Sequence, residues 1–416
     1  MQTILIVEPG SIFKNWILER LSKKYRVFVA TSIREDWLRL AIPDKQIIFT
    51  DPYNSATLVN DVVGYMEKNT IIFDGVGTFW EAVVTQTSDL SAVLGLHGCP
   101  VMAAYSSSQN KLLMRKKINE LGKNKVKFQA INIYDADVFL QVADFSLPCV
   151  IKPVNGSASQ GVKLISSVQD IPEVISDIQH TLTKETEEVF KNYKGQAVIE
   201  EYLEGIVVSV DGFVQARQIQ IIGNTEFIMG QEPYFTQIGS CIPARIDKKM
   251  CATLNEYCVE CVQQLGFDDC GFHGEFRISK DGNIKLLEIA ARLAGGPIVL
   301  GYEKAYGIDL IEAMVGIWLG KKVNLVAKYK RASIHKNYFP ALKKTSIFSE
   351  LKGLENIVNS QDLWDYIEII KPGDILEIYP KIPTSPLYYA LSGDNINILF
   401  SKILELEERI ICVTKE

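Results

Sequence analysis

The chain has 416 residues, 47% of them hydrophobic, and a formal net charge of −6 at pH 7. This length allows two to four domains with a sizeable core, and the acidic balance argues against a general surface for nucleic acid or anionic membranes. No apolar run approaches the roughly 20 residues that span a bilayer. The first residues, MQTILIVEPG, lack the basic segment of a signal peptide and are typical of a first strand. We therefore expect a cytoplasmic protein.

Eight cysteines are scattered along the chain, mostly inside apolar stretches. Cys258 and Cys261 have the spacing of a zinc-binding pair, but the chain holds only four histidines and no second pair of this kind. We expect ordinary buried thiols rather than a zinc site.

Residues 1–105 alternate short apolar runs with helical segments. The runs TILIVEPG, RVFVAT, KQIIFTD, TIIFDGVG and GCPVMAAY are expected to be strands. This alternation predicts a doubly wound parallel sheet. The first strand is not followed by G-x-G-x-x-G, so a dinucleotide site is not expected there.

After residue 105 the regular alternation of strands and helices ends. A serine cluster able to cap a helix precedes a basic helix that ends at Gly122, and two strands then flank the loop in CVIKPVNGSASQGV, residues 149–162. An amphipathic helical region and the strand QAVIEEYL follow. Beyond about residue 320 come further strands and a helix near 396–408.

The loop after Lys152 has the composition of an anion-binding segment. Gly156 and Gly161 allow backbone N–H groups to turn towards an anion, Ser157 and Ser159 add hydroxyl donors, and Lys152 adds a positive charge. These groups suit the phosphates of a nucleotide. The alternative is a polar hairpin whose lysine lies in solvent. The loop is not a Walker A motif.

A second motif, FHGEFRISKDGNIKLLEIAARLAGGP, contains an Asp-Gly pair between two alternating runs, which is a strong hairpin signal. A turn centred on that pair predicts three cross-strand neighbours: Glu275 with Glu288, Arg277 with Leu286, and His273 with Ala290. Like charges directly opposite destabilise a hairpin. The two glutamates therefore suit a cation between them, such as Mg²⁺ shared with phosphates. A three-residue turn would shift this register by one.

Arg292 follows Glu288 by four residues, on the same face if the strand continues. Its guanidinium can hydrogen-bond phosphoryl oxygens in a way that lysine cannot. The glycines after it would bring backbone close to a bound ligand.

Together, CVIKPVNGSASQGV, VIEEYLEG, HGEF and LLEIAARLAGG, in this order and spacing, resemble the ATP-grasp superfamily. The resemblance covers nearly the whole chain. Within the superfamily, the size, the EIAARLAGG motif and the long tail are most similar to bacterial L-amino acid ligases, which make dipeptides, and biotin carboxylase is more distant. It implies an α/β and α+β ATP-grasp fold with four parts: a Rossmann-like domain (1–105), a lid subdomain with a linker helix (106–198), a large subdomain (199–325) and an α+β domain (326–416).

The resemblance also implies a reaction. ATP would phosphorylate a carboxylate, and an amine would attack the acyl phosphate, giving an amide, ADP and phosphate. Mg²⁺ would be the metal, with Mn²⁺ as a substitute. Positioning and charge neutralisation would carry most of the catalysis.

Carried over to this chain, the resemblance assigns residues to each role. Lys111 and Lys152 would contact ATP phosphates, Glu275 and Glu288 would bind the metal, and Arg292 would stabilise the acyl phosphate. The closing loop would comprise Gly156, Ser157, Ala158, Ser159, Gln160 and Gly161. Adenine would meet the Glu200 side chain, the Glu201 carbonyl and the Leu203 N–H.

Two departures from the family pattern stand out. Ala290 occupies the position of an asparagine that often serves as a further metal ligand, which leaves the number of metal ions open. Val207 and Val208 stand where a carboxylate for the ribose often occurs.

The substrates are less defined by sequence. Substrate candidates are Glu81, Glu232, Arg245, Gly295 and Gly296, and His273 either contributes or packs beside the hairpin. The leading hypothesis is the joining of two amino acids. The alternatives are another carboxylate or amine, a bicarbonate-activating carboxylase, or an ATP-binding sensor without catalysis. Partners would be small molecules, with a homodimer as a candidate assembly.

Overall fold

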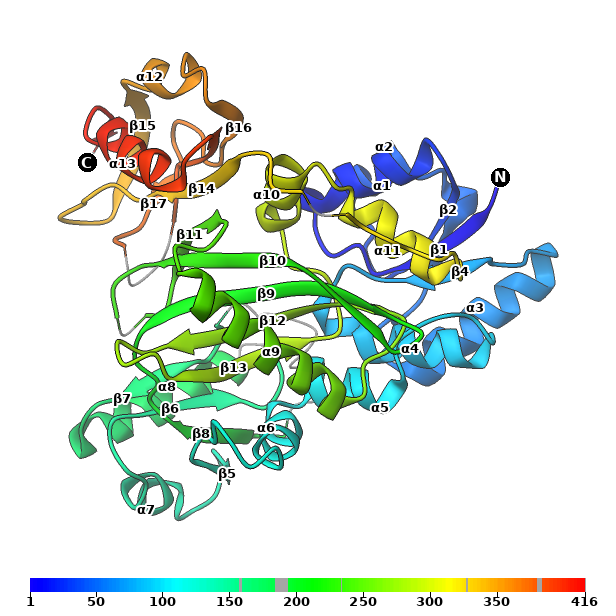
Figure 1. The fold of residues 1–416 in the computed structure, drawn as a ribbon, viewed down its shortest axis with the longest axis horizontal. Helices are drawn as coiled ribbons and strands as arrows, with labels where there is room; N and C mark the ends of the chain where they lie inside the picture. The colour runs from blue at the N-terminus through cyan, green and yellow to red at the C-terminus, as the bar shows by residue number, and fades with distance from the viewer. Residues whose placement is uncertain (157–158, 184–193, 233, 327, 380–383, 416) are drawn as a thin grey trace.

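The computed structural model describes residues 1–156, 159–183, 194–232, 234–326, 328–379 and 384–415. Within these ranges the strands form four sheets (Figure 1). No helix in the described part of the chain has both the length and the apolarity needed to cross a bilayer. All eight cysteines are free thiols, and six of them are buried.

The N-terminal sheet is parallel, with strand order β3-β2-β1-β4. Its strands are β1 (Thr3–Val7), β2 (Arg26–Thr31), β3 (Ile47–Phe49) and β4 (Gly75–Gly77). Alternate residues of β1 enter different cores: Ile4 and Ile6 pack with α1 (Asn15–Ser22) and α2 (Asp36–Ala41), whereas Leu5 and Val7 pack with α3 (Ser55–Asn69) and α4 (Val84–Val93). Helices therefore cover both faces, as the doubly wound prediction requires.

One strand predicted for this domain is wrong. Residues Val101–Ala104 form the helix α5, not a fifth strand. A short apolar run cannot be assigned from periodicity alone. Pro100, whose fixed φ suits the start of a helix, directly precedes α5, and Ala103 and Ala104 bury its inner face.

The basic helix is α6 (Lys111–Asn119), and its cap differs from the prediction. The serines at 106–108 lie in a π-helical turn, Tyr105–Gln109, that continues from α5. The cap is Asn110, whose side chain accepts a hydrogen bond from Leu113 N at 2.9 Å. The helix therefore starts at Lys111, which fixes that side chain at its first position.

A second sheet, here called the lid sheet, is antiparallel with order β5-β8-β6-β7. Its strands are β5 (Phe128–Asn132), β6 (Cys149–Pro153), β7 (Lys163–Ile165) and β8 (Gln196–Glu201). The helices α7 (Val138–Ala143) and α8 (Ile171–Thr183) share an apolar core with it. In Figure 1 the lid sheet packs beneath the largest sheet.

The largest sheet, here called the large sheet, has the order β13-β12-β9-β10-β11-β14-β18-β16. Its strands are β9 (Ile206–Gln215), β10 (Gln218–Met229), β11 (Gln237–Ile242), β12 (Cys270–Ile278), β13 (Ile284–Ala290), β14 (Ala332–Tyr338), β16 (Leu363–Glu368) and β18 (Leu387–Gly393). The pairing of β11 with β14 carries this sheet across the expected domain boundary at 325/326. The division into four parts therefore remains a prediction.

The remaining elements surround these sheets. A three-stranded sheet of the C-terminal region has the order β17-β15-β19. Its strands and the other helices are β15 (Ser346–Lys352), β17 (Ile375–Leu376), β19 (Ile411–Lys415), α9 (Lys248–Leu265), α10 (Pro297–Tyr306), α11 (Leu310–Trp318), α12 (Glu355–Val358) and α13 (Ile396–Glu407). Short 3-10 turns, η1 (Ile12–Lys14) and η3 (Glu81–Val83), follow strands of the N-terminal sheet.

The β12–β13 hairpin has the predicted glutamate pair, but it reaches that register by another route. Its loop has three residues, because Ser279 N donates to Asn283 O at 3.0 Å and Gly282, with φ +81°, closes the turn. Near the turn this shifts the pairing by one, so Arg277 faces Lys285 and the predicted Arg277–Leu286 pair is wrong. A bulge at residue 287 restores the register, and Glu275 faces Glu288.

Candidate functional site

A cavity of about 920 Å³ lies between the lid sheet and the large sheet. Its size is at the upper end of the range of about 300–1,000 Å³ found for small-molecule and cofactor sites. Its walls contain these residues predicted to bind nucleotide or metal: Lys111, Lys152, Gly156, Ser159, Gln160, Gly161, Glu200, Glu201, Leu203, Glu275 and Glu288. The predicted phosphate contacts Ser157 and Ala158 lie outside the described residues.

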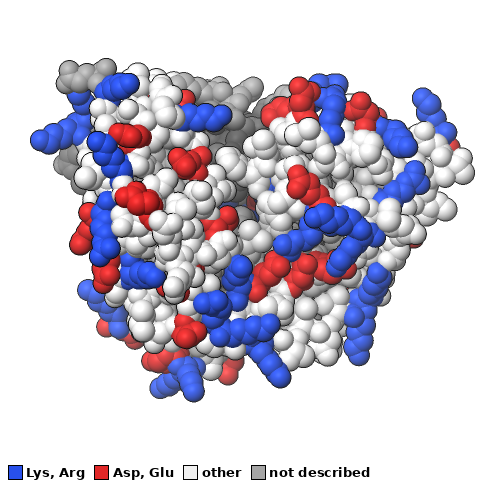
Figure 2. All heavy atoms as spheres, turned by 90° about the horizontal axis from the view of Figure 1, so that it is seen from above, with Lys and Arg blue, Asp and Glu red and all other residues white. Residues whose placement is uncertain are grey.

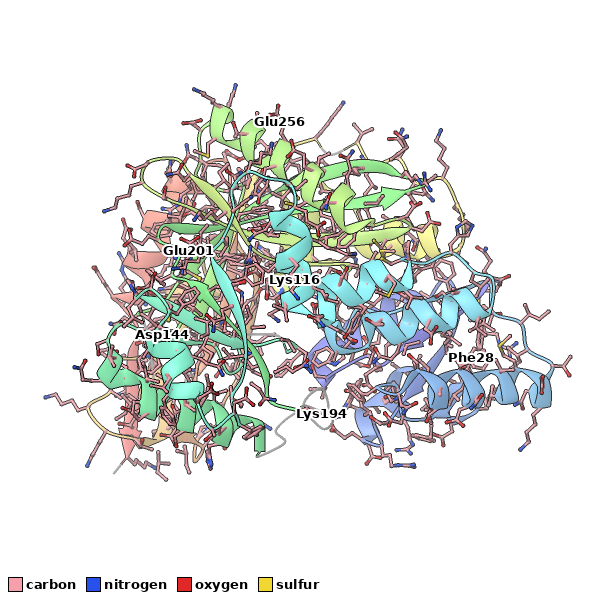
Figure 3. All side chains as sticks on the ribbon, turned by 90° about the horizontal axis from the view of Figure 1, so that it is seen from below. Phe28, Lys116, Asp144, Lys194, Glu201 and Glu256 are labelled. Carbon is pink, nitrogen blue, oxygen red and sulfur yellow. The ribbon has the colours of Figure 1, made fainter. Side chains whose placement is uncertain are left out.

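Two helices, α6 and α8, and two sheets, the lid sheet and the large sheet, contribute residues to the lining of this cavity. In Figure 3, α6 with Lys116 lies between the lid sheet, which carries Glu201, and the N-terminal domain, which carries Phe28. Figure 2 shows basic and acidic side chains interspersed over the face seen from above, without a large patch of one sign.

The carboxylate of Glu200 is held by two cations at one wall of the cavity. Arg115 Nε donates to Glu200 Oε1 at 2.7 Å and Arg115 Nη2 to Oε2 at 3.2 Å, while Lys152 Nζ lies 2.7 Å from Oε2. All three side chains are buried, and Arg115 is fully so. Arg115 Nη2 also donates to Leu287 O, the carbonyl of the bulged residue, at 3.1 Å. The cluster thus joins α6, β6, β8 and β13.

Pairing with Arg115 and Lys152 outweighs burial in setting the pKa of Glu200. Burial alone would raise the pKa of Glu200, but Arg115 and Lys152 bring it down to about 2, so the carboxylate is ionised. Burial lowers the pKa of Lys152, and Glu200 opposes that shift. Lys152 therefore reaches the cavity already paired with an acid.

Lys111 links the loop to the hairpin. Its Nζ donates to Gly156 O at 2.6 Å and lies 3.6 Å from Glu288 Oε2. The loop glycines adopt positive φ, +102° at Gly156 and +68° at Gly161, as the anion-loop prediction requires. Lysine and loop backbone are therefore adjacent at the same end of the cavity.

Part of the lining of the cavity is apolar. Its lining includes the following side chains: Val150, Leu203, Val207, Phe227, Met229 and Leu287. Leu203, 8% exposed, follows Glu201, whose Oε1 accepts from Lys285 Nζ at 2.7 Å. Val207 lines the cavity, whereas Val208 belongs to the core on the other face of β9. A flat apolar wall beside strand backbone suits a nucleobase, and the contacts of Glu200, Glu201 and Leu203 with adenine remain predictions.

Glu275 and Glu288 are cross-strand neighbours that both reach the cavity. Burial alone would raise the pKa of Glu288, but Lys111, Lys152 and Arg292 lower it. Glu275 Oε1 lies 3.1 Å from His273 Nε2. Two carboxylates thus lie side by side, next to Lys111.

His273 connects Glu275 to a buried acid that sequence reasoning missed. His273 Nδ1 lies 2.7 Å from Asp211 Oδ1, and Asp211 Oδ2 accepts from Ser209 Oγ at 2.8 Å and Tyr302 Oη at 3.0 Å. Burial would lower the pKa of His273, but Asp211 and Glu275 raise it to about 10. The imidazolium therefore bridges Glu275 and the buried Asp211, which is more than a packing role.

This donor set fits a magnesium ion shared with a nucleotide. Mg²⁺ is usually held by one or two carboxylates, with phosphates and water as its other ligands. Across the described ranges, no group of three or more His, Cys, Asp or Glu side chains could hold a metal ion without such help. Ala290, opposite His273, supplies no side-chain oxygen.

Arg292 lies just beyond β13, outside the lining of the cavity. Its Nε contacts Glu81 Oε2, and its Nη1 donates to Leu293 O at 2.7 Å. Glu81 begins η3, directly after the loop that follows β4. The structure thus brings two predicted residues together across the junction of the N-terminal domain and the large sheet. Next to them, a Cβ added at Gly295 or Gly296 would meet no heavy atom within 4 Å.

Two other substrate candidates lie elsewhere. Glu232 accepts a hydrogen bond from Tyr202 Oη and lies 3.9 Å from Arg277 Nη2, on the exposed side of the cavity rim. Arg245 pairs with Glu226 at 2.6 Å, and its guanidinium lies 3.9 Å from the ring centroid of Phe400 on α13. Arg245 therefore anchors α13 to the large sheet rather than joining the site.

Arg115 is the main site residue missed by sequence reasoning. It follows Lys111 by four residues in NKLLMR, so both side chains point from one face of α6. That spacing was the available signal. Its partner Glu200 is 85 residues away in sequence, which hid the pairing.

Replacing Arg115 by methionine should lower the free energy of unfolding by about 3–5 kcal/mol, because Glu200 would lose one of its two buried cations. The control is Lys116→Met on the same helix, since Lys116 is exposed and should tolerate the change within about 0.5 kcal/mol. Denaturant unfolding of both variants measures the difference. Equal stability of the two variants would show that the Arg115–Glu200 pair contributes nothing measurable.

Comparison with known proteins agrees with this geometry. Residues 145–299 match the ATP-grasp domain family. The alanine–anticapsin ligase of Bacillus subtilis is 22% identical over 266 residues, which are 61% of this chain and 55% of that protein. The chain thus spans about half the length of the curated relatives it matches.

Solved structures resemble the chain over its full length. An L-amino acid ligase from Bacillus licheniformis has a TM-score of 0.84 at 18% identity, covering 100% of this chain and 99% of that one. The biotin carboxylase domain of Hydrogenobacter thermophilus 2-oxoglutarate carboxylase, solved with MgADP and bicarbonate, has a TM-score of 0.72 at 10% identity, covering 100% and 91%. Residues 145–299 therefore form an ATP-grasp domain, and the chain as a whole has the ATP-grasp fold, similar to that of an L-amino acid ligase.

Proposed function

We propose that the protein is an ATP-dependent carboxylate–amine ligase that joins two amino acids through an acyl phosphate. The observation that carries this proposal is the grouping at one end of the cavity: Lys111 and Lys152 lie beside the Glu275–Glu288 pair, with Arg292 just beyond. Such a row of groups suits the transfer of a phosphoryl group from ATP to an acid. The two lysines would meet the phosphates, the acid pair would hold the metal, and the arginine would meet the acid.

Each charged group would have a distinct task. Lys111 and Lys152 would neutralise ATP phosphates, and the loop backbone at Gly156 would approach them. Glu275 and Glu288 would hold Mg²⁺, which when bound offsets the charge of the phosphoryl oxygens. Arg292, which also contacts Glu81, would bind the carboxylate that becomes phosphorylated. The γ-phosphoryl would pass to that carboxylate, and the amine of the second substrate would then displace phosphate.

Amino acids are proposed as the substrates because of the proteins to which this chain is similar. An alanine–anticapsin ligase and an L-amino acid ligase support a product with an amide between two amino acids. Structural likeness to a biotin carboxylase domain keeps a carboxylase as an alternative, since that protein uses the same fold with bicarbonate. Another carboxylate or amine, or an ATP-binding sensor without catalysis, would also fit the cavity. The homodimer and the use of Mn²⁺ stay predictions.

A screen of phosphate release from Mg-ATP over pairs of the common amino acids tests the proposal. We expect release that depends on particular pairs, with the dipeptide identified by its mass. Glu288→Gln should lower the rate by at least about 100-fold, because a charge that stabilises the transferring phosphoryl group is lost. The control is Glu256→Gln on α9, where the side chain is exposed. ATP binding without stimulation by any pair, carboxylate or amine would favour the sensor.

Metal affinity provides a test that does not depend on turnover. His273→Gln removes the imidazolium that holds Glu275, and loss of such a supporting partner typically weakens metal binding about 10–100-fold. We expect this loss for Mn²⁺ bound with ADP, followed by electron paramagnetic resonance. His180→Gln, on α8 of the lid, is the control for a histidine-to-glutamine change. Unchanged Mn²⁺ affinity in His273→Gln would limit His273 to packing.

A further inference from the structure

A lysine of the N-terminal domain lies beside the pair formed by Arg292 and Glu81. Lys14 ends η1, the short turn between β1 and α1. Its Nζ donates to Phe79 O at 2.5 Å and lies 4.6 Å from the ring centroid of Trp80. The next residue in that loop is Glu81, which contacts Arg292. The segment 79–81 therefore contacts both cations. Phe79 and Trp80 contact Lys14, and Glu81 contacts Arg292.

The charges at this place do not balance. Glu81 is the carboxylate that contacts Arg292, and its side chain and that of Arg292 are only 15% and 16% exposed. Among the described residues, no carboxylate lies within ion-pairing distance of Lys14, which contacts a carbonyl oxygen and an aromatic face. Two basic groups thus share one acid, with Lys14 itself half-buried. A second anion would complete the set, since buried charges are stabilised by pairing.

The pKa of the Lys14 amine is consistent with a binding site for an anion that is not part of the protein. Burial, with a smaller contribution from the nearby Arg292, lowers the pKa of Lys14 to about 7, and Glu81 opposes the shift. Phe79 and Trp80, which also face it, carry no charge. Near neutral pH the amine is therefore easily protonated when an anion arrives, and binding of that anion raises its pKa.

The chemistry of the proposed ligation supplies such an anion. When two amino acids are joined, the carboxylate of one becomes the amide, and the carboxylate of the other remains unreacted. Arg292 and the acid pair of the hairpin serve the reacting carboxylate. We propose that Lys14 binds the unreacted carboxylate of the amine-bearing substrate. This inference rests on the proposed function and deepens it, because it makes the acceptor an amino acid rather than a simple amine.

Acceptor kinetics test the inference. Lys14→Met should raise KM for the acceptor amino acid at least about tenfold, because one charge-assisted contact is lost, and should leave KM for the matching amino acid amide unchanged. Lys14→Arg should retain most of the affinity. Lys23→Met, an exposed lysine just after α1, is the matched control. Affinity for the amino acid, but not for its amide, should fall as the pH rises through about 7.

A binding measurement separates this inference from the proposed function. With ADP and Mg²⁺ present, single amino acids from the common set should raise the thermal unfolding midpoint of the unmodified protein, and their amides should not. The Lys14→Met variant should have a smaller shift than the unmodified protein, because an amino acid could still bind through its carboxylate at Arg292. Its ATP affinity should be retained, as a check of folding. Amino acids could shift the midpoint through Lys14 while no pair stimulates phosphate release. That result would support the carboxylate site and reject the ligase activity.

Two results would overturn the role of Lys14. In one, pairs of amino acids stimulate phosphate release, but Lys14→Met has the same KM values as Lys23→Met. The ligase activity would then be supported, and Lys14 would have no part in substrate binding. In the other, neither release nor the midpoint responds to any amino acid, which rejects both the ligase and the carboxylate site.

Discussion

The buried carboxylate of Glu200 is the group on which the nucleotide cavity depends. An ion of this kind loses several kcal/mol of hydration when it is removed from water, and it is stable only where partners replace that hydration. Arg115 and Lys152 supply these partners, and Arg115 also reaches the carbonyl of Leu287. One arrangement of α6, the lid sheet and the β12–β13 hairpin satisfies all these contacts at once. The cluster therefore fixes Lys152 at the cavity wall and sets the distance between the two sheets that enclose it.

The β12–β13 hairpin links the cavity to the contact between Arg292 and the N-terminal domain. The bulge at Leu287 has two consequences: it offers its carbonyl to Arg115, and it brings Glu288 opposite Glu275. Arg292 then follows at the end of the same segment and meets Glu81 from the N-terminal domain. In the proposed reaction, the hairpin acids would hold the metal and Arg292 would bind the acyl phosphate, so these groups would occur in the order in which the phosphoryl group travels.

Local sequence patterns account for much of this structure, and long-range pairing accounts for the rest. The parallel sheet, the glutamate pair and the loop glycines followed from periodicity, from Asp-Gly turn chemistry and from φ requirements. The register next to the turn was wrong because loop length cannot be fixed from an Asp-Gly pair, and a bulge leaves no mark in an alternating run. The helix at Val101–Ala104 was taken for a strand because four apolar residues suit either state. Arg115 with Glu200, and Asp211 with His273, are contacts between distant residues that only the fold brings together.

A direct test of the acyl-phosphate route uses a donor substrate labelled with ¹⁸O in both carboxylate oxygens. If the carboxylate attacks the γ-phosphoryl group of ATP, one of its oxygens leaves with the phosphate when the amine displaces it. Mass spectrometry of the released phosphate should then find one ¹⁸O atom per molecule, in step with the amide product. Phosphate without the label, released at the same rate, would contradict activation of the carboxylate and remove the chemical role assigned to Arg292 and the hairpin acids.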